Sequence, residues 1–118
     1  MRRLGLACLV LLIAAVGCVS GRMVMGVPPR VERLERELQI GKSTADDVRR
    51  VLGEPDGRGE SSLGIHDGHR TVWSYYYEFS DFSGSEVERW GRTFLWVYLD
   101  GQVYDGYLWF SSVTGSER

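Results

Sequence analysis

The sequence predicts an α+β domain, a two-layer sandwich in which two N-terminal helices pack on a three-stranded antiparallel sheet. Residues 40–55 combine capping signals at both ends with an apolar stripe at helical spacing. Residues 71–112 are rich in Trp, Tyr, Phe, Val and Leu, and they include Asp100-Gly101, a pair typical of a tight hairpin turn. A helical layer and a sheet layer are therefore both expected.

The first helix is expected to begin at Val31. Val31, Leu34 and Leu38 fall on one helical face, and charged residues cover the remaining faces. The helix should end before Gly41, and the short connection that follows predicts that the two helices are neighbours in space.

The second helix has clearer boundaries. Ser43 is expected to be its N-cap, and Asp46 three residues later completes a capping box. Gly53 is expected to cap the C-terminus, and Pro55 prevents the helix from continuing.

Three strands are expected after the helices. Residues 71–80 alternate between two faces, and residues 92–99 and 102–112 form a hairpin. Two glycine-rich or polar segments, 56–70 and 80–91, are interpreted as connecting loops.

A turn that pairs Leu99 with Gln102 assigns each hairpin residue to a face. The side chains expected to face the helices are Thr93, Leu95, Val97, Leu99, Tyr104, Leu108 and Phe110. Those expected on the other face are Phe94, Trp96, Tyr98, Tyr107 and Trp109. Such a broad aromatic face is a candidate protein-binding surface. The alternatives are that loops or a further element cover it, or that the strand register differs.

The N-terminus has the pattern of a secretory signal. Arg2 and Arg3 precede an uncharged apolar run over residues 4–16, which is shorter than the roughly 20 residues of a membrane-spanning helix. The run ends in Ala15-Val16-Gly17-Cys18, which resembles the lipobox of bacterial lipoproteins. This resemblance implies lipidation of the Cys18 thiol and cleavage before it. A short membrane helix, or cleavage elsewhere, is the alternative.

Three segments follow from this interpretation: a signal peptide over residues 1–17, a lipidated tether over 18–29 and the folded domain over 30–118. Cleavage removes Cys8, and acylation consumes Cys18, so the mature chain has no free thiol. Without Arg2 and Arg3, twelve basic residues remain against sixteen acidic ones, a net charge of −4. An acidic chain of this kind argues against nucleic acid as a partner.

Catalytic and metal-binding motifs are not evident. No nucleophile, base and orienting group occur together, so we expect no enzyme activity and no cofactor. His66, Asp67 and His69 offer metal-ligating atoms, but a glycine-rich loop does not hold such ligands rigidly, and a solvated loop is the favoured interpretation.

The second helical segment carries a spaced set of residues, Gly41, Thr44, Val48, Leu52, Gly53 and Pro55. With this set, the lipobox and the terminal hairpin, the chain resembles the BamE (SmpA/OmlA) family of outer-membrane lipoproteins, whose helix pattern these residues approximate. Lys42 replaces the usual methionine, and the family's Asp-Pro-Phe and Asn-Gln-Gly segments are missing. The family's binding residues are therefore not transferable.

The resemblance implies a membrane anchor and an accessory role in the β-barrel assembly machine. The expected function is that of a non-catalytic, lipid-anchored scaffolding protein in outer-membrane protein assembly or envelope maintenance. Val19 and Ser20 are not inner-membrane retention signals, so we expect the periplasmic face of the outer membrane. The alternative is an inhibitor-like or receptor-like module, because a helix-plus-sheet unit also resembles the β-lactamase inhibitor proteins.

Overall fold

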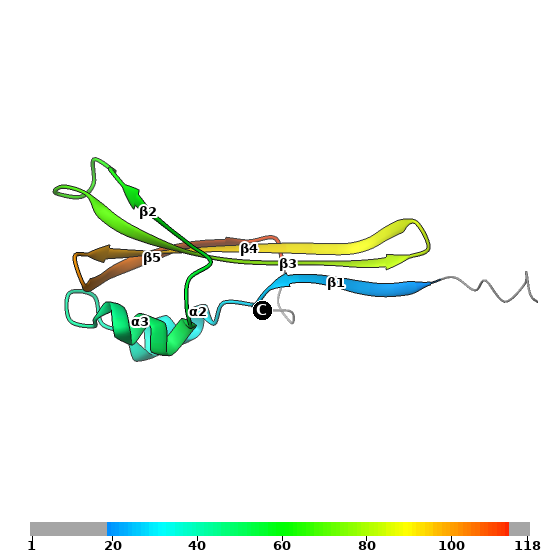
Figure 1. Ribbon diagram of the computed structural model, residues 1–118, viewed down its shortest axis with the longest axis horizontal. Coiled ribbons are helices and arrows are strands. Elements are labelled where there is room, and N and C mark those ends of the chain that lie inside the picture. The colour runs from blue at the N-terminus through cyan, green and yellow to red at the C-terminus, as the bar shows by residue number, and fades with distance from the viewer. Residues whose placement is uncertain (1–18, 114–118) are drawn as a thin grey trace, which may run out of the picture.

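The computed structural model describes residues 19–113 as a five-stranded antiparallel sheet with two short helices on one face (Figure 1). The elements in chain order are β1 (Ser20–Gly26), α2 (Val31–Glu37), α3 (Ala45–Leu52), β2 (Gly57–Ser61), β3 (Arg70–Ser83), β4 (Glu86–Asp100) and β5 (Val103–Ser111). The predicted fold, with two N-terminal helices on a three-stranded sheet, is wrong. The described chain is mostly sheet, β1 precedes the helices, and β2 lies within the predicted loop at 56–70, so both strands join the sheet.

Both additional strands pair with the same edge of β3. β2 pairs near the start of β3, between Gly57↔Ser74 and Ser61↔Arg70, and β1 pairs near its end, between Ser20↔Ser83 and Gly26↔Tyr77. The expected tether at residues 18–29 is thus largely a strand. The residues of β1 are exposed and show no apolar periodicity, so β1 is held in the sheet by its pairing with β3 and not by burial of its side chains.

Asp56 fills the gap between the two edge strands. Its backbone N–H donates to the Ser74 carbonyl at 2.9 Å, and its carboxylate accepts from the backbone N–H of Tyr76 at 2.7 Å. These bonds satisfy part of the edge of β3 that neither β1 nor β2 reaches.

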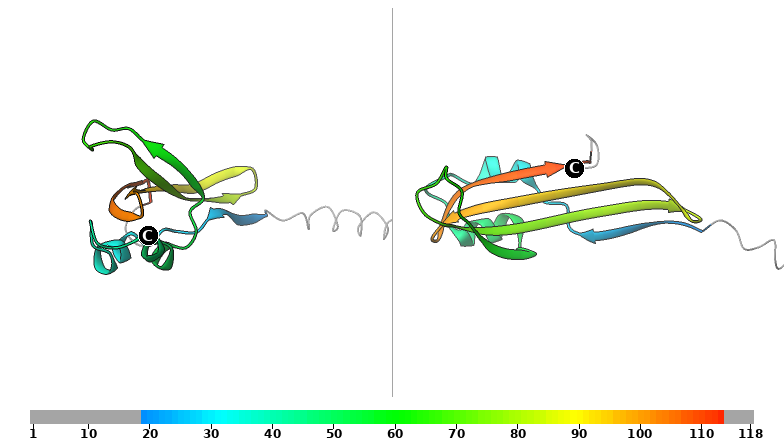
Figure 2. Two further views of the ribbon diagram at one scale, coloured as in Figure 1. Left: turned by 60° about the vertical axis from the view of Figure 1, so that its left-hand side comes forward. Right: turned by 90° about the horizontal axis from the view of Figure 1, so that it is seen from above.

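β3 and β4 form one long hairpin that extends well beyond the helices (Figure 2). The predicted polar connection at residues 80–91 is wrong, because both strands continue through it to a turn at Gly84. Gly84 has a φ of 61°, which a glycine adopts without strain. We call residues 77–93 of this hairpin, together with β1, the distal arm.

The helices follow the predicted apolar stripes. Val31, Leu34 and Leu38 of the first helical segment are all buried, as expected. The N-cap of α3 is Thr44 rather than Ser43: its hydroxyl accepts from the Asp47 N–H at 3.3 Å, and the Asp47 carboxylate accepts from the Thr44 N–H at 2.8 Å. The capping box is therefore present, shifted by one residue.

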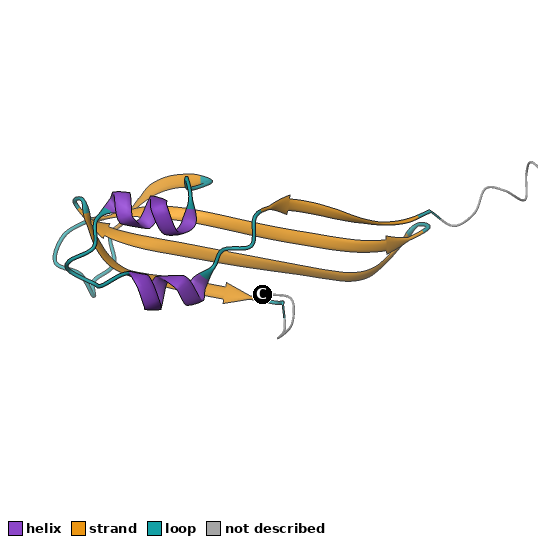
Figure 3. Cartoon of the chain, turned by 90° about the horizontal axis from the view of Figure 1, so that it is seen from below, coloured by secondary structure: helices purple, strands orange, loops and turns teal. Residues whose placement is uncertain are grey.

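The connection between the helices is fastened to the outer edge of β5 (Figure 3). Gly41 donates to the Tyr104 carbonyl at 2.9 Å, and Tyr104 donates to the Ser43 carbonyl at 2.8 Å. Ala45 donates to the Gln102 carbonyl at 2.9 Å. These bonds fix the helical layer over the β4–β5 end of the sheet.

The main core lies between the helices and this end of the sheet. Its buried members are Val31, Leu34, Leu38, Ala45, Val48, Val51, Trp73, Tyr75, Leu95, Val97, Leu99 and Tyr104. Burial raises the pKa of Tyr75 to about 12, and its hydroxyl donates to the Gly53 carbonyl at 3.0 Å. The C-cap of α3 is thereby tied to the sheet.

A second, smaller cluster consists of Tyr77 and Phe79 of the distal arm and Val113, which follows β5. Two guanidinium groups cover the Phe79 ring, with Cζ of Arg22 at 4.7 Å and Cζ of Arg89 at 5.9 Å from its centroid. Cation–π contacts and side-chain stems thus bury an aromatic ring where no helix reaches.

Leu34→Ala should lower the free energy of unfolding by about 2 to 5 kcal/mol, because it truncates a fully buried side chain at the centre of the main core. Chemical denaturation with urea measures this loss. Ile65→Ala, at a side chain that is 83% exposed, is the control and should change stability by less than about 0.5 kcal/mol. Equal effects would show that α2 does not pack as described.

Gly91→Ala should destabilise the distal arm by about 1 to 3 kcal/mol, the usual cost of overpacking. The added Cβ would lie 2.5 Å from Cγ2 of Val113 and 2.6 Å from Cε1 of Phe79. Gly59→Ala is the matched control, because an added Cβ there meets no atom within 4 Å. Thermal unfolding compares the two, and equal melting temperatures would contradict the packing of Phe79.

Candidate functional site

The candidate site is the face of the sheet turned away from the helices, which we call the open face. It consists of Val72, Ser74, Tyr76 and Glu78 of β3, Phe94, Trp96 and Tyr98 of β4, and Leu108 and Phe110 of β5. Side chains alternate along each strand, so the buried residues Leu95, Val97 and Leu99 take the helix side and leave Phe94, Trp96 and Tyr98 on this face. These three were predicted here.

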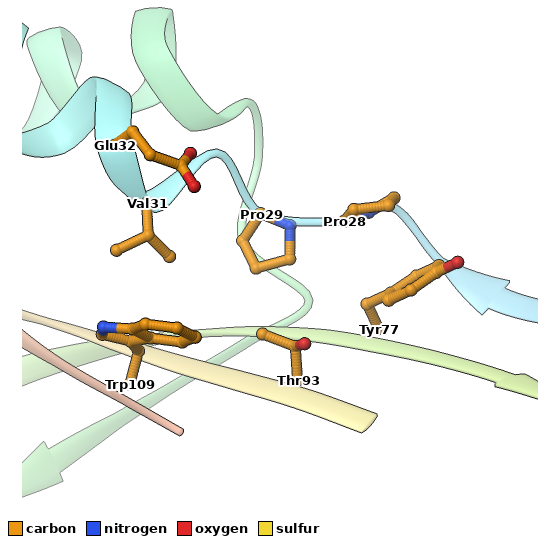
Figure 4. Close-up of a pocket in the computed structure, with 7 residues that line it drawn as sticks. All are labelled: Pro28, Pro29, Val31, Glu32, Tyr77, Thr93 and Trp109. Atoms are coloured by element: carbon orange, nitrogen blue, oxygen red, sulfur yellow. The ribbon is translucent and has the colours of Figure 1, made fainter. Parts of the chain in front are cut away.

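Tyr107 and Trp109 lie on the helix side, which corrects the predicted aromatic face. They pair with Val97 and Leu95, and both pack against the main core. Figure 4 shows the Trp109 ring beneath Val31 of α2, in a small pocket at the start of that helix. The Tyr107 hydroxyl donates to the Glu35 carboxylate at 2.5 Å, and this bond, with some burial, raises the pKa of Tyr107 to about 12.

A β-bulge in the hairpin explains the correction. The turn pairs Asp100 with Val103 and Leu99 with Tyr104, so the expected Leu99–Gln102 pair is wrong, but this shift of two residues leaves each side chain on the face predicted for it. A β-bulge then follows, because Tyr98 pairs with Gly106 and leaves Asp105 as an extra residue. An extra residue moves every later side chain to the opposite face.

Leu108 and Phe110 therefore join the open face, where sequence reasoning did not place them. The signal that could have revealed this is Gly106, since a glycine inside a strand often marks a bulge. Its φ of 115° is a conformation that side-chain-bearing residues rarely adopt.

Aromatic rings form a continuous packed group on the open face. The ring centroids of Tyr76 and Phe94 are 4.9 Å apart, and those of Phe94 and Phe110 are 5.5 Å apart. Trp96 meets Phe110 edge-on, at 5.5 Å and 84°. These contacts fix the rings in place while leaving Trp96 37%, Leu108 46% and Phe110 47% exposed.

A groove lies at one end of the open face. Residues 57–63, from β2 and the loop after it, form one wall, and side chains of the sheet form the floor, including Val72, Trp96, Tyr98 and Leu108. Its volume is about 630 Å³, and it is widely open to solvent. The lining is mainly apolar, as in sites that bind apolar side chains or small molecules.

The loop after β2 is held against the end of this groove. The His66 ring lies 5.7 Å from the Tyr98 ring, and its Nδ1 is 3.7 Å from the carboxylate of Asp105. Arg70 also donates to Asp105 at 2.8 Å, so the bulge residue has two cationic or polar neighbours. Across residues 19–113, no three His, Cys, Asp or Glu side chains gather as a metal site would need.

The ion pair between Glu78 of the open face and Arg92 is internally neutral. The Glu78 carboxylate accepts a hydrogen bond from the Tyr76 hydroxyl and lies 3.4 Å from Arg92 Nε. The bond from Tyr76 and the nearby positive charge lower the pKa of Glu78, and the same bond raises the pKa of Tyr76. This face therefore offers apolar and aromatic contacts rather than a strong charge.

In comparisons with protein families, curated proteins and solved structures, nothing matches this chain. None of the helices in the described part of the chain is long and apolar enough to cross a membrane. Cys18, the predicted lipidation site, and the predicted signal peptide at residues 1–17 lie outside the described residues.

Proposed function

We propose that this chain is a non-catalytic, lipid-anchored envelope protein that binds another envelope protein through its open face. The exposed patch around Trp96, Leu108 and Phe110 is the observation that carries the proposal. Contiguous apolar patches on soluble domains usually mark interaction surfaces, and fixed aromatic side chains are frequent anchors there.

The chemistry of the open face restricts the kind of partner. Glu78 and Arg92 neutralise each other, so a partner gains little from charge at this surface. The groove beside Trp96 and Tyr98 suits apolar side chains presented by a loop or an extended segment of a protein. Acidic overall composition and the neutral face both argue against nucleic acid.

The location follows from the lipobox that ends at Cys18 and from the residues after it. Acyl chains contribute about 0.8 kcal/mol per buried CH₂, so two or more chains hold a domain firmly on a membrane. Val19 and Ser20 favour export to the periplasmic face of the outer membrane. The partner favoured by the BamE resemblance is a subunit of the β-barrel assembly machine.

Trp96→Ala should weaken binding to that partner by about 2 kcal/mol, which is roughly a thirtyfold loss of affinity, with little loss of fold stability. Trp109→Ala is the matched control, since the same residue type lies on the helix side of the same hairpin. It should lower the free energy of unfolding while leaving the affinity of the folded protein unchanged. Affinity purification from solubilised envelopes, with denaturation of each variant, compares them.

This experiment can support the proposed function, support the inhibitor-like alternative or contradict the assigned binding surface. Recovery of barrel-assembly subunits that Trp96→Ala abolishes supports the proposal. Recovery of a soluble periplasmic or secreted enzyme instead supports the inhibitor-like alternative. Unchanged recovery with Trp96→Ala contradicts the open face as the binding surface.

Cys18→Ser should leave the precursor unprocessed or mislocalised, because only a thiol accepts the diacylglyceryl group. Membrane fractionation and intact-mass measurement test this. The wild-type chain should float with outer-membrane markers and carry added acyl mass, whereas a Cys18→Ser chain that is still cleaved and membrane-bound would refute lipidation at this position.

A further inference from the structure

The first described residue lies at the tip of the distal arm. The Val19 carbonyl accepts a hydrogen bond of 2.8 Å from the backbone N–H of Gly84, in the turn between β3 and β4. Consecutive Cα atoms are about 3.8 Å apart, so Cys18 is attached within one peptide unit of this contact. A lipid on Cys18 would therefore attach at the hairpin tip.

The chain that leaves this point is a strand and not a flexible linker. Every residue of β1 pairs with a residue of β3, from Ser20↔Ser83 to Gly26↔Tyr77. Arg22 makes two hydrogen bonds with the Asp81 carboxylate, at 2.5 and 2.8 Å, and its guanidinium lies over the Phe79 ring. The seven residues of β1 span about 23 Å at roughly 3.3 Å per residue.

We infer that the hairpin tip rests on the surface of a lipid bilayer and that the distal arm is a rigid strut that holds the helices and the groove away from it. This inference depends on the proposed lipidation of Cys18. The strut fixes both the height and the orientation of the open face, so a partner would meet it beside the membrane rather than within it.

The side chains near the tip fit a neutral lipid surface. The turn itself is small and uncharged, at Gly84 and Ser85, and the neighbouring Val19 and Val87 are 70% and 61% exposed. Asp81, Glu86 and Glu88 outnumber Arg22 and Arg89 at this end of the arm, so it has no excess of positive charge that would attract anionic lipids. Contact at the level of zwitterionic headgroups is the arrangement that these residues favour.

Charges along the arm disfavour lying flat on the bilayer. One side carries Arg22, Asp81 and Arg89, with Asp81 within 4 Å of both guanidinium groups. The other side carries Glu78 and Arg92. Pressing either side into the bilayer would remove charged groups from water, whereas contact through the tip leaves both sides solvated.

Two single-cysteine reporters test the orientation, because acylated Cys18 leaves the mature chain without a free thiol. Ser85→Cys lies at the tip, and Gln102→Cys lies in the turn at the opposite end of the sheet. Each full-length precursor is processed in bacteria, purified, labelled with the same fluorophore and reconstituted into phosphatidylcholine vesicles that contain a headgroup-labelled quencher lipid.

Quenching should be several-fold stronger at position 85 than at position 102. Equal quenching at both positions would show that the arm lies flat, and stronger quenching at 102 would show the reverse orientation; either result overturns the inference. A variant with β1 replaced by a Gly/Ser linker of equal length should lose most of the difference, and retention of the full difference would refute the role of β1 as a strut.

Failure of the anchor itself gives a separate result. If Cys18 carries no lipid, intact mass lacks the acyl increment, the protein does not float with the vesicles and neither reporter is quenched. That result refutes lipidation and the strut together. A floating, acylated protein with equal quenching refutes only the strut and leaves the binding role of the open face standing.

Discussion

The helices are much shorter than the strands, and this mismatch in length decides which parts of the sheet the helices can cover. α3 has eight residues and spans about 12 Å at 1.5 Å per residue, whereas β4 has fifteen residues and spans about 50 Å at 3.3 Å per residue. Two such helices cover one end of one face of the sheet. The distal arm and the whole open face remain without a helical layer.

Apolar side chains are buried in one of these two uncovered regions and exposed in the other. In the distal arm, Arg22 and Arg89 lie over the Phe79 ring and Val113 packs with it. Gly91 has no side chain and so leaves space for the ring. On the open face, within residues 19–113, nothing comparable covers Trp96 or Phe110. An apolar surface that is fixed by ring packing but left exposed has the properties expected of a binding surface.

Local sequence signals predicted those parts of the fold that depend on local chemistry. The apolar stripe of the first helix is buried as expected, and so are Ala45, Val48 and Val51 of the second, whereas Leu52 is half-buried. The alternation in β4 placed Phe94, Trp96 and Tyr98 correctly. The Thr44 capping box could be misread by one residue because Ser43 and Asp46 have the same spacing as Thr44 and Asp47. Such ambiguity moves a helix boundary without changing the fold.

Features set by long-range pairing were not predictable in the same way. β1 and β2 have no buried apolar face, and only their hydrogen bonds to β3, far away in sequence, define them as strands. The bulge residue Asp105 is bonded to Arg70, thirty-five residues away in the sequence. Because of this bulge, the open face carries Leu108 and Phe110 instead of the predicted Tyr107 and Trp109. One inserted residue thus moved two of the five predicted site residues to the other face of the sheet.

The proposed function requires that the open face, and not the helical layer, meets the partner. Site-specific photocrosslinking in intact cells tests it most directly, with a photoreactive amino acid at position 110 on the open face or at position 36 on the exposed surface of α2. We expect a discrete adduct with an envelope protein from position 110 and none from position 36. An adduct from position 36, with none from position 110, would contradict it.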